Sequence, residues 1–151
     1  MHYGIQPDVV STAKGLAGGL PLGATMLGEK VKDIFEPGLN GSTFGGNPVC
    51  CSGAVNVLSR LTDEFLDEVT NKANLIRETL SGAEGIESIS GLGLIMGIKT
   101  TKEAKEVVNY CIEKGVLVLT AKDKVRLLPP LNIETNELVK ALDIIKEACK
   151  L

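Results

Sequence analysis

The spacing of hydrophobic residues along the chain predicts four main helices. Apolar side chains recur every three or four residues, which is the period of one face of an α-helix. Two of these segments carry clear boundary signals: Asn47-Pro48 supplies an N-cap and a first-turn proline, and Gly115 is placed to end the third helix. The four predicted helices cover residues 48–61, 63–80, 102–114 and 135–148.

Shorter apolar runs, bounded by Gly, Pro or polar residues, predict strands. Pro129-Pro130 stops the last of them, because proline cannot donate to a strand ladder. A short helix is also expected over residues 29–35, ended by Pro37-Gly38. The predicted strands cover residues 8–11, 24–27, 86–90, 92–99, 116–119 and 125–128.

The chain changes character near residue 82. Residues 1–82 are rich in glycine and loops and end in a long helix, whereas strands and helices alternate closely in residues 83–151. We therefore expect an α/β chain in two parts, the second a small α+β domain with its own core. Of the 151 residues 44% are hydrophobic and 23% charged, which is ordinary for a globular protein.

Composition argues against several classes of function. A net charge of −3 and only 3% aromatic residues do not suit a nucleic-acid surface. No apolar run approaches the roughly 18 residues of a membrane span, and no signal peptide is expected. The cysteines, at positions 50, 51, 111 and 149, lack metal-ligand spacing, and His2 is the one histidine. We expect no metal site, and reduced thiols in a cytoplasmic protein.

Lys14 is the first candidate for chemistry. It follows a predicted strand and precedes a run that contains Gly15, Gly18, Gly19 and Gly23. Residues without side chains let a planar group approach the lysine amine, and a lysine that loses its charge can form a Schiff base. A surface lysine beside a flexible loop is the simpler interpretation, and the residue types alone favour it.

Two further segments stand out. Gly41-Ser42-Thr43-Phe44-Gly45-Gly46 precedes the N-cap Asn47, and hydroxyls with free backbone N–H groups before a helix suit an anion. Arg126 lies in an apolar strand, where its planar fork suits a carboxylate. The alternatives are a plain capped helix for the first segment, and for Arg126 a solvent-facing side chain or an internal ion pair.

Together these motifs resemble class III (fold type I) aminotransferases of the acetylornithine/ornithine type, which depend on pyridoxal 5′-phosphate (PLP). The family's cofactor-lysine motif, Ser/Thr-x-x-Lys-Gly followed by Gly-Gly-x-Pro-x-Gly-Ala, is matched from Ser11 to Ala24. Its Gly-Ser/Thr-Thr-Phe/Tyr-Gly-Gly-Asn-Pro motif is matched from Gly41 to Pro48. The resemblance implies a PLP-dependent transferase fold, with residues 1–82 in the large domain and 83–151 as the small domain.

The resemblance also implies roles for single residues. Lys14 would bind PLP as a Schiff base and move the substrate proton, and Thr43 would reach the cofactor phosphate of the partner subunit in a homodimer. Ser42 would lie beside the substrate. Arg126, which precedes an x-x-Pro-x-Leu turn as in the family, would hold the substrate α-carboxylate.

The implied reaction is transamination between N-acetylornithine and 2-oxoglutarate in arginine biosynthesis. Phe44 and the compact stretch 114–130 favour the acetylornithine type. Ornithine or 4-aminobutyrate aminotransferases, an aminomutase, and a non-catalytic fragment remain alternatives. The family's Asp-Glu-x-Gln motif and phosphate loop would lie upstream of Met1, so we expect this chain alone to be inactive.

Overall fold

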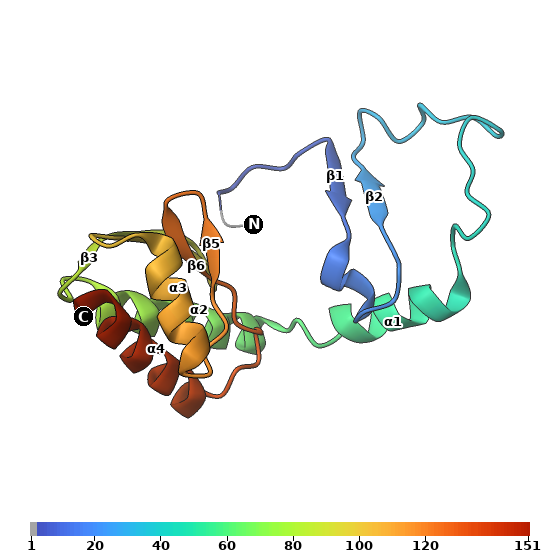
Figure 1. Cartoon of the computed structure of the whole chain (residues 1–151). Helices are drawn as coiled ribbons and strands as arrows, with labels where there is room; N and C mark the ends of the chain where they lie inside the picture. Colours follow the sequence, from blue (N-terminus) through green and yellow to red (C-terminus); the bar gives the residue numbers. More distant parts are fainter. Residues whose placement is uncertain (1–2) are drawn as a thin grey trace. The chain divides into compact units, whose positions relative to one another are not determined.

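The computed structural model describes residues 3–151, which divide into two compact units (Figure 1). The first unit ends at Thr62 and the second begins at Asp63. Helix α2 therefore packs with the second unit, whereas the sequence places it at the end of the first domain. The assignment of residues 1–82 and 83–151 to the domains of a larger protein stays a prediction.

The first unit contains a two-stranded antiparallel sheet and one long helix. Strand β1 (Val9–Thr12) pairs with β2 (Ala24–Leu27), with Val9 opposite Leu27 and Thr12 opposite Ala24. A single 3-10 turn, η1 (Lys14–Ala17), leaves β1, and helix α1 (Pro48–Leu58) packs against it. These strands lie where the hydrophobic pattern predicts them.

Helix α1 begins as the sequence predicts. The Asn47 side chain accepts hydrogen bonds from the backbone N–H groups of Val49 and Cys50, at 3.0 and 3.2 Å. Pro48 occupies the first helical position, where its missing N–H costs nothing. Together these two residues fix where the loop of the second motif ends.

The helix predicted over residues 29–35 is wrong. The segment forms isolated turns, with Val31 N–H bonded to the Gly28 carbonyl and Ile34 N–H to the Val31 carbonyl. Its apolar residues Ile34 and Phe35 are exposed, so no core stabilises a helix there. So short a helix is not stable without such packing.

The second unit is an antiparallel sheet covered on one face by helices. The sheet has the strand order β3-β4-β6-β5 (Figure 1). The strands are β3 (Ile86–Leu92), β4 (Ile95–Thr100), β5 (Leu119–Ala121) and β6 (Lys124–Leu127). The helices are α2 (Asp63–Leu80), α3 (Ala104–Glu113) and α4 (Thr135–Lys150).

The core of this unit lies between the sheet and its helices. Met96 and Ile98 of β4 and Val125 and Leu127 of β6 are buried against the apolar faces of the helices. Because side chains alternate along a strand, Gly97, Lys99, Lys124 and Arg126 lie on the opposite face of the sheet. That face carries no helix of this unit.

The strand predicted at residues 116–119 is largely wrong. Strand β5 covers Leu119–Ala121, because the preceding residues close helix α3 instead. Gly115 adopts a left-handed φ of 85°, and Val116 N–H bonds back to the Cys111 carbonyl at 2.8 Å. This is the hydrogen bonding of a glycine-terminated helix end. The strand predicted at residues 125–128 is confirmed as β6.

No helix in the described part of the chain is long and apolar enough to cross a membrane.

Candidate functional site

Lys14 occupies an unusual backbone position. It follows β1 directly, opens the turn η1, and has a φ of 56°. A left-handed φ is uncommon for a residue with a side chain and costs about 1–3 kcal/mol. Such strain is retained where surrounding structure fixes it, often at functional sites. The side chain is exposed, so its amine is accessible.

The surroundings of Lys14 leave room for a ligand. A Cβ atom added at Gly15 or Gly19 would meet no atom within 4 Å. Gly18 ends the turn in a left-handed conformation with φ 63° and donates its N–H to the Gly15 carbonyl. The glycine-rich segment therefore places an accessible lysine in a turn with open space at its glycines, as the sequence predicts.

The turn that carries Lys14 is held by helix α1. Gly53 lies so close to it that a Cβ atom there would be 2.9 Å from the Ala17 carbonyl oxygen. Ala17 is buried in this contact, as are Cys50 and Ala54 of α1. The sequence reasoning missed Gly53, although a glycine within a helical pattern is itself a signal of close packing.

Ser42 and Thr43 lie in the loop before α1. The loop forms two turns, in which Gly45 N–H bonds to the Ser42 carbonyl at 3.0 Å and Asn47 N–H to the Phe44 carbonyl at 3.3 Å. Both hydroxyl residues are exposed, and Phe44 exposes 80% of its surface. The helix that begins at Pro48 therefore connects this loop to the Lys14 turn within one unit.

Arg126 belongs to the second unit, on the open face of its sheet. It stands opposite Gly97 of β4 and Leu119 of β5. Its Nε atom is buried and has no hydrogen-bond partner among the described residues. An unsatisfied buried donor costs about 1–3 kcal/mol, so a ligand that accepts this hydrogen bond would be favoured.

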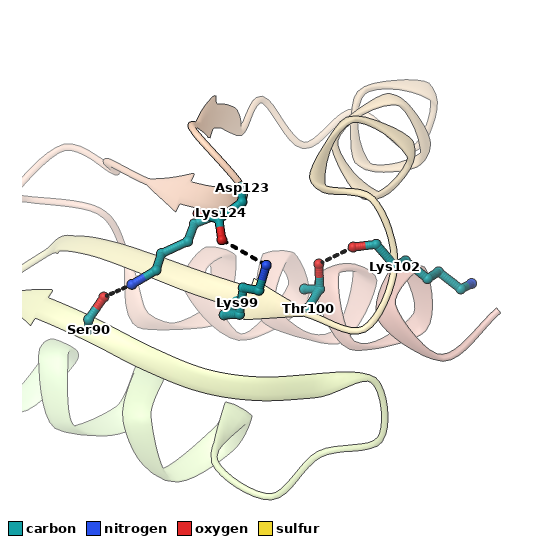
Figure 2. Close-up of polar contacts among 6 residues, drawn as sticks. All are labelled: Ser90, Lys99, Thr100, Lys102, Asp123 and Lys124. Carbon is teal, nitrogen blue, oxygen red and sulfur yellow. Dashed lines mark hydrogen bonds and ion pairs between the residues drawn. The ribbon is translucent and has the colours of Figure 1, made fainter.

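Lys99 and Lys124, which Figure 2 draws, share this face with Arg126 by the strand register. Lys124 donates to the Ser90 hydroxyl at 2.8 Å, and Lys99 pairs with Asp123 at 2.7 Å. The Lys99–Asp123 contact raises the pKa of Lys99 and lowers the pKa of Asp123. The sequence reasoning did not single out Lys124, yet the alternation Lys124-Val125-Arg126 in a strand puts both cations on one face.

The described residues contain no cluster of three or more His, Cys, Asp or Glu side chains that could hold a metal ion.

Comparison with known proteins identifies the group to which these motifs belong. A family model described as aminotransferase class-III matches residues 1–149. Acetylornithine aminotransferase from Haemophilus ducreyi is 44% identical over 148 residues, which are 97% of this chain and 38% of that protein. The corresponding enzyme from Methanothermobacter thermautotrophicus is 39% identical and covers 95% of this chain.

Solved structures agree with the sequence relatives. Acetylornithine aminotransferase from Elizabethkingia anophelis superposes with a TM-score of 0.85 at 30% identity, covering 97% of this chain and 42% of that one. Ornithine aminotransferase from Toxoplasma gondii, whose crystals show partial PLP occupancy at the active site, gives 0.86 at 32% identity over 98% of this chain. The chain thus spans about two fifths of the length of its relatives. It has the α/β fold of this part of them, and it belongs to the class III aminotransferase family.

Proposed function

We propose that this chain is the portion of a PLP-dependent aminotransferase that carries the cofactor lysine and one substrate-binding arginine. The whole protein would transfer an amino group from N-acetylornithine to 2-oxoglutarate, a step of arginine biosynthesis. The observation that carries the proposal is the position of Lys14, exposed and left-handed in a glycine turn with open space. The relatives named acetylornithine aminotransferase support the choice of substrate.

The residues around Lys14 fit PLP. A Cβ atom at Gly15 or Gly19 would meet nothing within 4 Å, which supports room for a flat ring beside the lysine. When bound, PLP would supply an electron sink for the negative charge that develops at the substrate carbon bearing the free amino group. In this proposal Lys14 would hold the cofactor until the substrate amine displaces it, and the freed lysine amine would then move the proton from that carbon to C4′ of the cofactor. The turn fixed by α1 keeps the amine in position for both tasks.

Arg126 would recognise the substrate α-carboxylate. Its buried Nε–H has no partner within residues 3–151, and a carboxylate supplies two oxygens that match the planar guanidinium. Ser42 would contact the same substrate. 2-Oxoglutarate and the glutamate formed from it both carry a carboxylate next to the reacting carbon, so Arg126 would serve the half of the transamination that uses them.

Thr43 supports a proposal about assembly. We expect a homodimer in which Thr43 reaches the cofactor phosphate of the partner subunit, since its loop is exposed and able to contact another chain. The free cysteines at positions 50, 51, 111 and 149 support a reducing, cytoplasmic location. No nucleic-acid or membrane partner is proposed.

Ornithine aminotransferase is the second candidate function. It is favoured by the Toxoplasma gondii structure, which superposes as well as the acetylornithine enzyme does. The two activities differ in whether the amino donor carries an N-acetyl group, and therefore in its charge.

A transamination assay with 2-oxoglutarate tests the proposal. The whole protein should use N-acetylornithine better than ornithine or 4-aminobutyrate, and Lys14→Ala should abolish turnover. The 151-residue chain alone, with saturating PLP, should be inactive, because losing even one positioned electrostatic group costs on the order of 10²–10³ in rate. A whole protein that preferred ornithine would support the second candidate, and one without transamination would refute both.

A further inference from the structure

On the open face of the second sheet, Arg126 lies beside an arrangement of Gly97, Lys124 and Ser90. Gly97 stands directly opposite Arg126 in the β4–β6 register, so the neighbouring strand offers no side chain at that level. A Cβ atom added to Gly97 would lie 3.1 Å from Cδ of Lys124 and 3.8 Å from its Cβ. The methylene stem of Lys124 therefore fills the space that Gly97 leaves.

The end of the Lys124 side chain is held in place. Its ammonium donates to the Ser90 hydroxyl of β3 at 2.8 Å (Figure 2). That hydroxyl in turn donates to the Gly97 carbonyl at 3.4 Å. The side chain thus crosses the whole of β4, from β6 to β3. Lys124 is only partly exposed, although it lies on the open face of the sheet.

Repulsion explains the direction that Lys124 takes. Lys99 is its direct partner across the β4–β6 ladder, and like charges at such positions destabilise a sheet. The two ammonium groups diverge: Lys99 turns to Asp123 at 2.7 Å, and Lys124 turns to Ser90 (Figure 2). The Lys99–Asp123 pair therefore favours the path of Lys124 over Gly97.

We infer that Lys124 is a positioning residue for Arg126. Its stem lies over Gly97, the direct cross-strand neighbour of Arg126, and is anchored at Ser90, so that it borders the arginine, whose buried Nε–H has no partner among the described residues. The guanidinium is then already ordered when a carboxylate arrives, and less conformational entropy is lost on binding. The inference rests on the carboxylate role proposed above for Arg126.

NMR of the arginine Nε–H groups in the 151-residue chain tests this directly. The arginines are Arg60, Arg77 and Arg126, so a 15N-labelled chain gives a simple spectrum that Arg→Lys variants assign. Arg60 is an internal reference, because its Nε donates to Asn56 at 3.1 Å on the surface of the other unit. The readouts are the exchange of the Arg126 Nε–H with water and its shift during titration with L-glutamate.

Four variants separate the stem from its charge and its anchor. Lys124→Ala should speed exchange of the Arg126 Nε–H and weaken L-glutamate binding about threefold to tenfold, since the arginine must then be ordered on binding. Lys124→Met and Ser90→Ala both keep the stem and lose its anchor, so both should lie between wild type and Lys124→Ala. Lys105→Ala, a change of an exposed lysine on α3, is the control and should keep the Arg126 signal, while the Arg60 signal should not change in any variant.

Two results would count against these ideas in different ways. Equal Arg126 exchange and equal L-glutamate affinity in wild type and Lys124→Ala would overturn the positioning role alone. A wild-type Arg126 signal that ignores L-glutamate, or responds equally to isoglutamine, which lacks the α-carboxylate, would overturn the carboxylate role of Arg126 and this inference with it.

Discussion

Lys99 of β4 and Asp123 of the turn between β5 and β6 form an ion pair, with 2.7 Å between Nζ and Oδ2. The contact raises the pKa of Lys99 and lowers the pKa of Asp123, and the hydrogen bond between the two side chains is the largest cause of both shifts. It fixes the turn between β5 and β6, because Asp123 lies between those strands. Solvent reaches both side chains, so its effect on stability is modest.

This pair predicts an acid dependence of stability. Because the folded pKa of Asp123 is lowered, its stabilisation is present above the unfolded pKa and is lost as the pH falls through the folded value. Asp123→Asn should therefore reduce the loss of thermal stability between about pH 4 and pH 2. Melting curves over this range, with Asp143→Asn as a control in a weaker 3.7 Å pair, would check it. Identical slopes in wild type and Asp123→Asn would contradict it.

The buried thiols predict slow alkylation. Burial raises the pKa of Cys111 to about 11 and also raises that of Cys149. At pH 8 only about one Cys111 thiol in a thousand would be ionised, and the thiolate is the reactive form. Iodoacetamide followed by peptide mass spectrometry should modify the half-buried Cys51 well before Cys111 or Cys149. Comparable rates in the native chain, before any unfolding, would refute this.

The raised pKa values of these thiols also predict that folding stability depends on pH in the alkaline range. A raised folded pKa means that the unfolded state loses its protons first, so stability falls as the pH rises above the ordinary thiol value of 9.0 toward 11. Urea unfolding of wild type and Cys111→Ala at pH 8 and pH 10 would show it. The wild type should lose more stability over this interval than the variant.

Gly91 is predicted to be the least replaceable glycine of the second sheet. Its φ is 131°, and a Cβ atom there would collide with the Ile95 carbonyl oxygen and lie 2.9 Å from Cα of Met96. Gly91→Ala should cost more than about 2 kcal/mol of unfolding free energy. Gly41→Ala, where a Cβ atom meets nothing within 4 Å and φ is ordinary, is the control. Similar urea midpoints for both variants would contradict the structure.

Lys14 is predicted to be the preferred site of PLP attachment even in this chain. Incubation with PLP, borohydride reduction and peptide mapping should label Lys14 more than Lys30, whose ammonium is 3.1 Å from Asp8. Lys14→Ala should lower total labelling, whereas Lys30→Ala should not. Even labelling of the exposed lysines would show that the glycine turn confers no preference.

The sequence predicts the elements that local chemistry determines. Asn47-Pro48 starts α1 and Gly115 ends α3, because caps and prolines act within a few residues. The strand predicted at 116–119 fails because Val116 N–H completes the end of α3, which periodicity does not reveal. The predicted helix at 29–35 fails because its apolar residues find no core. Helix propensity is a weak guide without such packing.

The candidate site was predictable where it depends on a motif. Lys14, Ser42, Thr43 and Arg126 were proposed from the sequence because their segments resemble family motifs. Lys124 and Gly53 were not, because their neighbours depend on which strand or turn lies next to them. A Cβ at Gly53 would be close to the Ala17 carbonyl, and this follows only from how α1 packs on the Lys14 turn.

The thin core of the first unit determines how mutations there will behave. Its buried apolar side chains among the described residues are Ala17, Cys50 and Ala54, while Phe35, Phe44 and Val55 are exposed. Truncating one of those exposed residues removes much less packing from the isolated chain than truncating a buried one. The same change would be costly wherever another polypeptide covers that side chain. Mutational tolerance measured on these 151 residues will therefore overstate the tolerance of this unit in any larger assembly.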